Sequence, residues 1–107
     1  MTSKEGLNSV KGLMGKTAFI TGGASGIGFG MAQAFARAGM NIMIADIEQA
    51  ALDKAVADLN KSANVQVSGV RCDVSLRDTM FEAAQTTFAQ FGKVHVVCNN
   101  AGIGAGG

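Results

Sequence analysis

The sequence predicts an α/β fold: a doubly wound parallel sheet of four strands in the order 3-2-1-4, with three helices. Four short apolar runs alternate along the chain with three segments of helical periodicity, and the links between them are short. Right-handed crossovers make such strands parallel, and the order 3-2-1-4 follows if the chain reverses direction after the third strand. With 107 residues, 48% apolar and 16% charged, the chain has the composition of one folded domain.

The first half of the chain is expected to contain two strands and two helices. We expect a strand at residues 16–21 and a helix at residues 25–38, which ends before Gly39. The apolar face of this helix is expected to hold Ile27, Met31, Ala34, Phe35 and Ala38. A strand at residues 41–45 then leads to a second helix, which Asp46 opens. The inner face of the second helix is expected to hold Leu52, Ala55, Val56 and Leu59.

The second half is expected to add two strands and one helix. The strands are expected at residues 65–72 and 94–98, and the third helix between them ends at Gly92. Ser75 with Asp78 resembles a capping box at the start of this helix. Its inward-facing residues are expected to be Leu76, Met80, Ala83, Ala84, Phe88 and Phe91.

A glycine-rich turn at residues 21–28, between the first strand and the first helix, indicates what the chain binds. Such a turn gathers free backbone N–H groups around the positive end of the helix, which favours a pyrophosphate. Gly22 allows the sharp turn, Gly26 lets the backbone approach the phosphates, and Gly28 lets helix and strand pack closely.

Composition argues against several other functions. The net charge is +1 without a basic stripe, so nothing favours nucleic acid. No apolar run approaches the ~20 residues of a membrane span, and no secretory signal is visible. Cys72 and Cys98 are interpreted as buried thiols of a reducing, cytoplasmic compartment, with a disulfide or metal site as the less favoured alternative. His95, inside an apolar strand, is interpreted as a core or partly buried residue rather than a catalytic one.

The glycine pattern TGxxxGxG lies on Thr21, Gly22, Gly26 and Gly28, and the tetrad Asn99-Asn100-Ala101-Gly102 follows the last strand. In these motifs the chain resembles the N-terminal half of the short-chain dehydrogenase/reductase family, from about residue 15 to residue 102. The resemblance implies a Rossmann-type fold. We therefore expect residues 1–15 to form an N-terminal arm and residues 16–107 to form a partial dinucleotide-binding domain.

Asp46, at the end of the second strand, is expected to select the cofactor. A carboxylate there can accept hydrogen bonds from both ribose hydroxyls of the adenosine and repels a 2′-phosphate. Neither Ser25 nor Ile47 supplies a cation for that phosphate, so NAD is favoured over NADP. The alternative interpretation of Asp46 is an N-cap of the second helix.

The resemblance also implies roles for two later segments. The pair Asp73-Val74 is expected to lie against the adenine, with a turn before the third helix as the alternative. The tetrad is expected to lie close to a ribose. Where the family usually has Asp, this chain has His95, which alters a structural hydrogen bond. The expected cofactor-binding residues are Gly22, Ser25, Gly26, Ile27, Gly28, Asp46, Asp73, Val74, Asn100, Ala101 and Gly102.

The chain has no tyrosine, whereas the family uses a Tyr, a Lys and a Ser that follow the tetrad. We expect no catalytic residue, no substrate site and no metal site here. The chain is interpreted as the N-terminal NAD(P)-binding part of an oxidoreductase that moves hydride between a nicotinamide and an alcohol or carbonyl. Alone it is expected to be inactive, and the alternative is a stand-alone nucleotide-binding or interaction module. The parent protein is expected to be a homo-oligomer, and this chain to self-associate through the open edge of its fourth strand.

Overall fold

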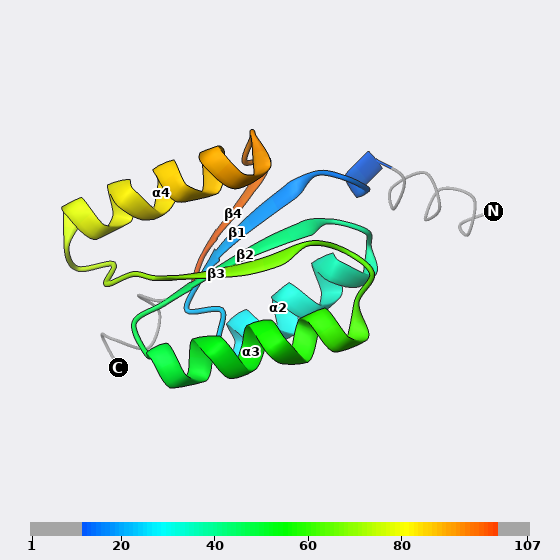
Figure 1. The fold of residues 1–107 in the computed structure, drawn as a ribbon, viewed down its shortest axis with the longest axis horizontal. Helices are drawn as coiled ribbons and strands as arrows, with labels where there is room; N and C mark the ends of the chain where they lie inside the picture. Colours follow the sequence, from blue (N-terminus) through cyan, green and yellow to red (C-terminus); the bar gives the residue numbers. More distant parts are fainter. Residues whose placement is uncertain (1–11, 101–107) are drawn as a thin grey trace.

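The computed structural model describes residues 12–100, which form four strands and three helices in strict alternation (Figure 1). The strands are β1 (Thr17–Thr21), β2 (Asn41–Asp46), β3 (Val67–Arg71) and β4 (Val96–Asn99). The helices are α2 (Gly26–Arg37), α3 (Gln49–Ser62) and α4 (Arg77–Phe91). Each element lies within a few residues of its expected range, which is the ordinary uncertainty of element ends.

All strand pairs are parallel, and the sheet order β3-β2-β1-β4 confirms the expected topology. The last residue of β1, Thr21, lies opposite Ala45 of β2 and Asn99 of β4. Asp46 lies opposite Arg71 at the end of β3. The register therefore brings the carboxyl ends of all four strands to one edge of the sheet.

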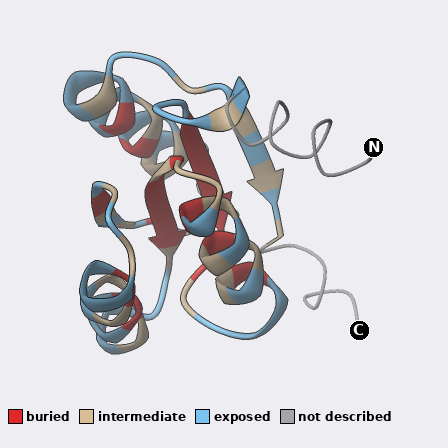
Figure 2. Ribbon diagram, turned by 90° about the vertical axis from the view of Figure 1, so that its right-hand side faces the viewer, coloured by how far each residue is buried: buried red, intermediate tan, exposed pale blue. Residues whose placement is uncertain are grey.

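Helices cover both faces of the sheet. Helices α2 and α3 lie on one face, and α4 lies on the other (Figure 1). The larger core cluster joins α2 and α3 to the sheet and includes Ile20, Ile42 and Leu52. A smaller cluster under α4 includes Phe19 and Met43. Buried residues concentrate on the inner strands and on the helix faces turned toward them (Figure 2). All five residues of β1 are buried, as expected for a strand covered on both sides.

The expected face of α2 was partly wrong, although Phe35 packs against the larger core cluster as expected. Ile27 is 72% exposed, and the buried residues of this helix are instead Gly28, Ala32 and Ala36. These small residues recur every fourth position and form one stripe. Contact through small side chains lets the helix axis come close to the sheet, so the larger apolar residues flank the contact.

Helix α3 begins at Gln49, three residues after Asp46, so Asp46 does not open it. Helix α4 begins at Arg77 after the N-cap residue Leu76, without a side-chain capping bond, so the expected capping box is wrong. The inward face of α4 was also partly wrong. Leu76 and Phe88 are each more than half exposed, whereas Ala83 and Thr87 are buried.

His95 is exposed, contrary to expectation, and it pairs with the first residue of β1. The Thr17 backbone N–H donates to His95 Nδ1 at 3.0 Å, and the His95 N–H donates to the Thr17 carbonyl oxygen at 2.9 Å. The His95 imidazole therefore supplies the hydrogen-bond acceptor for Thr17 at the position where the family usually has Asp. Part of the expected N-terminal arm lies outside the described residues, and its end is packed: Leu13 contacts the larger core and the Gly15 N–H donates to the Gly39 carbonyl.

Candidate functional site

The glycine turn occupies the carboxyl end of β1 and leads directly into α2. Gly22 and Gly26 have φ values of +63° and +58°, which only glycine adopts without strain. A Cβ at Gly26 would meet nothing within 4 Å, so the space beside this residue is open. The first N–H groups of a helix have no partner within the helix, and the Ser25 side chain makes no capping bond to them. The turn can therefore offer backbone donors to an anion.

Close packing of α2 against the turn depends on Gly28. A Cβ there would lie 2.1 Å from the Gly22 carbonyl oxygen and 2.8 Å from Asn100 Nδ2. No side chain fits at that distance. Glycine is therefore required at this position for contact, while Gly22 and Gly26 are required for conformation.

Asp46 is held at the end of β2 by two backbone donors. Its Oδ2 accepts the N–H of Ala24 at 3.1 Å, and its Oδ1 accepts the N–H of Glu48 at 3.1 Å. The first bond ties the carboxylate to the glycine turn, and the second stabilises the bend that precedes α3. The carboxylate is only partly buried, so lone pairs remain available to a ligand.

Asp73 organises the bend after β3. Its Oδ1 accepts both the Ser75 hydroxyl at 2.6 Å and the Ser75 N–H at 2.9 Å. These bonds, with the nearby Arg71 charge, hold the pKa of Asp73 below its ordinary value of 3.8. The Asp73 N–H in turn donates to the Thr79 hydroxyl at 3.2 Å, which joins the bend to α4. Local side-chain bonds of this kind replace the expected capping box.

A hollow of about 300 Å³ lies between these segments. Its lining residues are Gly22, Asp46, Ile47, Cys72, Asp73, Val74 and Ser75. Four of them, Gly22, Asp46, Asp73 and Val74, are expected cofactor-binding residues from three separate segments of the chain. Cys72 and Ser75 were not expected there.

The ends of β1 and β4 are joined through the Thr21 hydroxyl. It accepts the N–H of Asn100 at 2.9 Å and lies 3.1 Å from Asn99 Oδ1, to which it can donate. This bond fixes the start of the tetrad beside the glycine turn. Ala101 and Gly102 lie outside the described residues.

The structure also assigns contacts that the sequence interpretation missed. Ala24 donates to Asp46, and Thr79 accepts from Asp73. Gly23 is needed for packing, since a Cβ there would lie 2.9 Å from Ile44 Cγ2. A threonine shortly after an aspartate is a recognisable signal, whereas a backbone donor such as Ala24 leaves none in the sequence.

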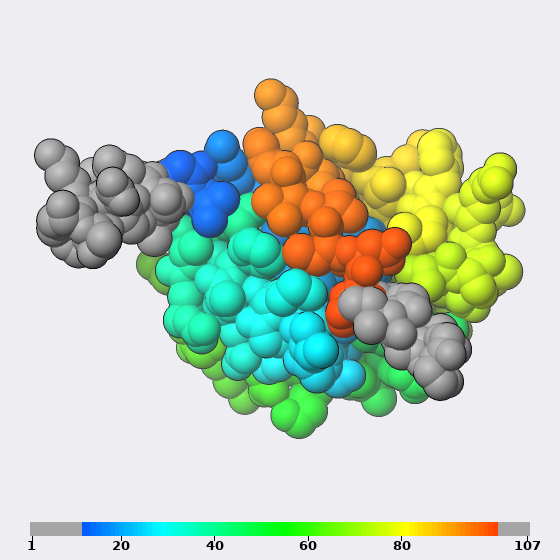
Figure 3. Space-filling model, turned by 180° about the vertical axis from the view of Figure 1, so that it is seen from behind, coloured from blue at the N-terminus to red at the C-terminus, as the bar shows by residue number. Residues whose placement is uncertain are grey.

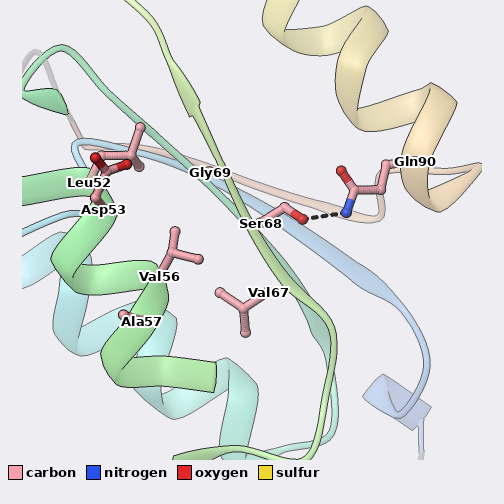
Figure 4. Close-up of a pocket in the computed structure, with 8 residues that line it drawn as sticks. All are labelled: Leu52, Asp53, Val56, Ala57, Val67, Ser68, Gly69 and Gln90. Atoms are coloured by element: carbon pink, nitrogen blue, oxygen red, sulfur yellow. Dashed lines mark hydrogen bonds between the residues drawn. The ribbon is translucent and has the colours of Figure 1, made fainter. Parts of the chain in front are cut away.

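A larger hollow, of about 420 Å³, lies between α3 and the edge strand β3 (Figure 4). It opens beside the first residues of β3, away from the carboxyl edge, and Asp53 is its one ionisable lining residue. The Gln90 amide of α4 donates to the Ser68 hydroxyl there. Among residues 12–100, no helix is long and apolar enough to cross a membrane, and no cluster of metal-ligating side chains occurs.

The model of the short chain dehydrogenase family matches residues 16–107. The chain is 40% identical over 91 residues to 1-deoxy-11-beta-hydroxypentalenate dehydrogenase of Streptomyces exfoliatus, which covers 85% of this chain and 33% of the relative. It is 38% identical over 99 residues to C alpha-dehydrogenase of a Sphingobium species, covering 92% of this chain and 32% of the relative.

Solved structures agree with the fold. A short chain dehydrogenase/reductase from Burkholderia phymatum in complex with NAD superposes with a TM-score of 0.77 at 38% identity, over 79% of this chain and 30% of that chain. L-sorbose reductase from Gluconobacter frateurii, complexed with NADPH and L-sorbose, gives a TM-score of 0.79 at 31% identity, over 82% and 34%. The chain spans about a third of the length of these curated relatives. The motifs, the strand order and these matches together show that the chain belongs to the short-chain dehydrogenase family.

Proposed function

We propose that this chain binds NAD at the carboxyl edge of its sheet, as the cofactor-binding part of an oxidoreductase. The observation that carries the proposal is the joint position of the glycine turn and the Asp46 carboxylate, which the Ala24 N–H links. A dinucleotide needs backbone donors for its pyrophosphate and an acceptor for its adenosine ribose. The chain offers both at the ends of two neighbouring strands, β1 and β2.

The remaining expected residues fit the same ligand. The Ser25, Gly26 and Ile27 segment is exposed at the start of α2, where a pyrophosphate would accept backbone N–H groups. Asp73 and Val74 line the hollow beside Asp46, which supports an adenine there. We propose that the tetrad, including Asn100, Ala101 and Gly102, borders the second ribose.

NAD is favoured over NADP because Asp46 is already held in place by two donors. An added 2′-phosphate would face a fixed negative charge, and neighbouring Ile47 offers no compensating cation. When bound, the nicotinamide ring of such a cofactor would accept a hydride from an alcohol or donate one to a carbonyl. Because the chain has no tyrosine, we propose that it does not catalyse this reaction by itself. The two free thiols, Cys72 and Cys98, support a reducing compartment such as the cytoplasm.

Calorimetric titration of the chain with NAD and NADP tests the proposal. Hydrogen bonds to a charged group contribute about 1.5–3 kcal/mol, so Asp46→Asn should reduce the preference for NAD by roughly ten- to a hundredfold. Glu48→Gln is the matched control, because this exposed carboxylate lies two residues away and does not line the hollow. Tighter binding of NADP to the unmodified chain, or an equal effect of the two substitutions, would contradict the assignment. Turnover of secondary alcohols at ordinary enzymatic rates would contradict the proposed inactivity.

A further inference from the structure

The hollow beside the glycine turn is lined in part by a segment that has neither helix nor strand structure. Residues 72–75, called here the wall segment, supply four of its lining residues. This segment lies between Arg71, where β3 ends, and Arg77, where α4 begins. Because no backbone ladder holds it, its position depends on the individual bonds that tie it to its neighbours.

Thr79, in the first turn of α4, bonds to both backbone polar groups of Asp73. The Thr79 hydroxyl accepts the Asp73 N–H at 3.2 Å and lies 2.6 Å from the Asp73 carbonyl oxygen, to which it can donate. The Leu76 carbonyl oxygen, at 3.0 Å, is an alternative acceptor. One hydroxyl can accept and donate at the same time, so it fixes the orientation of the Asp73 backbone relative to α4.

The wall segment has two other ties, and neither takes the place of this hydroxyl. The Cys72 N–H donates to the Asp46 carbonyl oxygen at 3.0 Å, which ties the start of the segment to β2. From α4, Met80 Sδ lies 3.3 Å from Cys72 Sγ, and a thioether is only a weak acceptor. The Thr79 hydroxyl is therefore the polar tie that joins the middle of the wall segment to α4.

Helix α4 is a firm base for such a tie. Ala83 is fully buried in the smaller core cluster, so the helix is packed against the sheet one turn after Thr79. Thr79 is itself partly buried, whereas residues 75–78 are exposed. The wall segment and the first turns of α4, yellow-green to yellow in Figure 3, lie together at one end of the molecule. Thr79 thus connects a packed helix to a segment at the molecular surface.

We propose that Thr79 is a positioning residue for the cofactor. Its hydroxyl holds Asp73 and Val74 at the distance from Asp46 that the adenosine of NAD requires. This inference rests on the proposed function. Thr79 does not line the hollow, so it acts through Asp73 and not on the ligand itself. Without the hydroxyl the wall segment would have to be ordered at the moment of binding, and such ordering reduces affinity.

Thr79→Val tests the proposal, because valine has nearly the shape of threonine and lacks the hydroxyl. Titration calorimetry of the full 107-residue chain should show that the dissociation constants for NAD and for AMP each rise by about tenfold, which corresponds to one hydrogen bond. AMP carries the adenosine without the nicotinamide half. The ratio of NAD to NADP affinity should stay unchanged, since Asp46 is intact. Thr79→Ser, which keeps the hydroxyl, should restore the affinity.

Thr86→Val is the matched control, because it makes the same substitution in the same helix. Thr86 is exposed, its hydroxyl donates to the Glu82 carbonyl oxygen at 2.9 Å within α4, and it does not line the hollow. This variant should bind NAD and AMP as tightly as the unmodified chain.

Far-UV circular dichroism separates lost positioning from lost folding, since a misplaced wall segment weakens binding while the helix signal is retained. Thr79→Ala, which favours the helix more than valine does, carries the test if Thr79→Val fails to fold. Loss of the helix signal in both variants would assign Thr79 to folding and overturn the positioning role.

The titrations also distinguish this inference from the proposed function. An unmodified chain that binds neither NAD nor AMP would overturn both. A chain that binds NAD equally well with and without the Thr79 hydroxyl would overturn the positioning role alone. An equal loss in Thr86→Val, or a Thr79→Ser variant that stays as weak as Thr79→Val, would overturn it as well.

Discussion

Adding a single methyl group at Gly28 tests how closely α2 must approach the glycine turn. The new Cβ would lie 2.1 Å from the Gly22 carbonyl oxygen, whereas non-bonded heavy atoms sit at about 3.5 Å. The obstructing atom belongs to the backbone and cannot rotate away, so the helix would have to withdraw by about 1.4 Å. Overpacking of this kind costs about 1–3 kcal/mol, and the gain in helix propensity offsets up to about 1 kcal/mol. We expect Gly28→Ala to lower the free energy of unfolding by about 2 kcal/mol.

Gly30→Ala is the matched control, because it adds the same methyl group to the same helix. A Cβ at Gly30 would meet nothing within 4 Å. Alanine is preferred to glycine inside a helix by about 0.5–1 kcal/mol, so this substitution should raise the free energy of unfolding. The two variants therefore differ in the sign of their effect.

Urea unfolding followed by far-UV circular dichroism measures both effects. The chain has no tryptophan or tyrosine, so the helix signal is the practical probe. All variants must be compared at one protein concentration, since self-association changes apparent stability. If Gly28→Ala proved as stable as Gly30→Ala, the close contact between α2 and the turn would be refuted as a requirement of the fold.

Three further predictions concern single side chains. His95→Ala should lower the free energy of unfolding by about 1–3 kcal/mol because the buried Thr17 N–H loses its acceptor. His95→Asp should restore most of this stability, since a carboxylate can accept the same bond. Retained stability in the alanine variant would contradict the role of His95 as the acceptor. Ser75→Ala should raise the pKa of Asp73 toward 3.8, which carboxyl NMR titration can follow. A lowered pKa adds folding stability above pH 3.8, and this stability is lost as the pH falls through the pKa of the folded state. The variant should therefore lose less stability on acidification than the unmodified chain. Burial raises the pKa of the Cys72 thiol, so iodoacetamide should alkylate it far more slowly in the folded chain than in urea, and equal rates would show that the site opens freely.

The strand order and the site edge could be predicted because their signals are local. The glycine turn marks the end of β1, and polar residues follow the apolar runs of the other strands, so that parallel crossovers bring those ends together. Asp46 was located correctly for this reason, as the residue directly after a buried apolar run. Its bond to Ala24 could not be predicted, because any residue type offers the same backbone N–H.

The buried faces of the helices were harder to predict because large apolar residues also occur on their exposed sides. On α4, Phe81 and Phe88 are exposed while Thr87 is buried, with its hydroxyl donating to the Ala83 carbonyl at 2.7 Å. That bond satisfies the hydroxyl inside the helix, so a threonine can take the contact position. Counting large apolar residues therefore placed Phe88 on the buried face, although Met80, Ala83 and Phe91 were placed there correctly. The same reasoning misplaced Ile27 on α2.

The bond between Asp46 and the Ala24 N–H has a consequence for redesign of cofactor preference. An engineer who wished to admit a 2′-phosphate would first replace this carboxylate with a neutral or basic side chain. That exchange would also remove one of the bonds that join the glycine turn to β2, and only the Gly22 and Gly23 N–H groups, which donate to the Ala45 carbonyl, would still hold the turn there. Under the proposed function, a less firmly held turn would weaken the binding of NAD and NADP alike, and the discrimination between them would fall as well. A successful redesign has to supply a new acceptor for Ala24 before it changes the charge, so preference and rigidity have to be rebuilt as one unit.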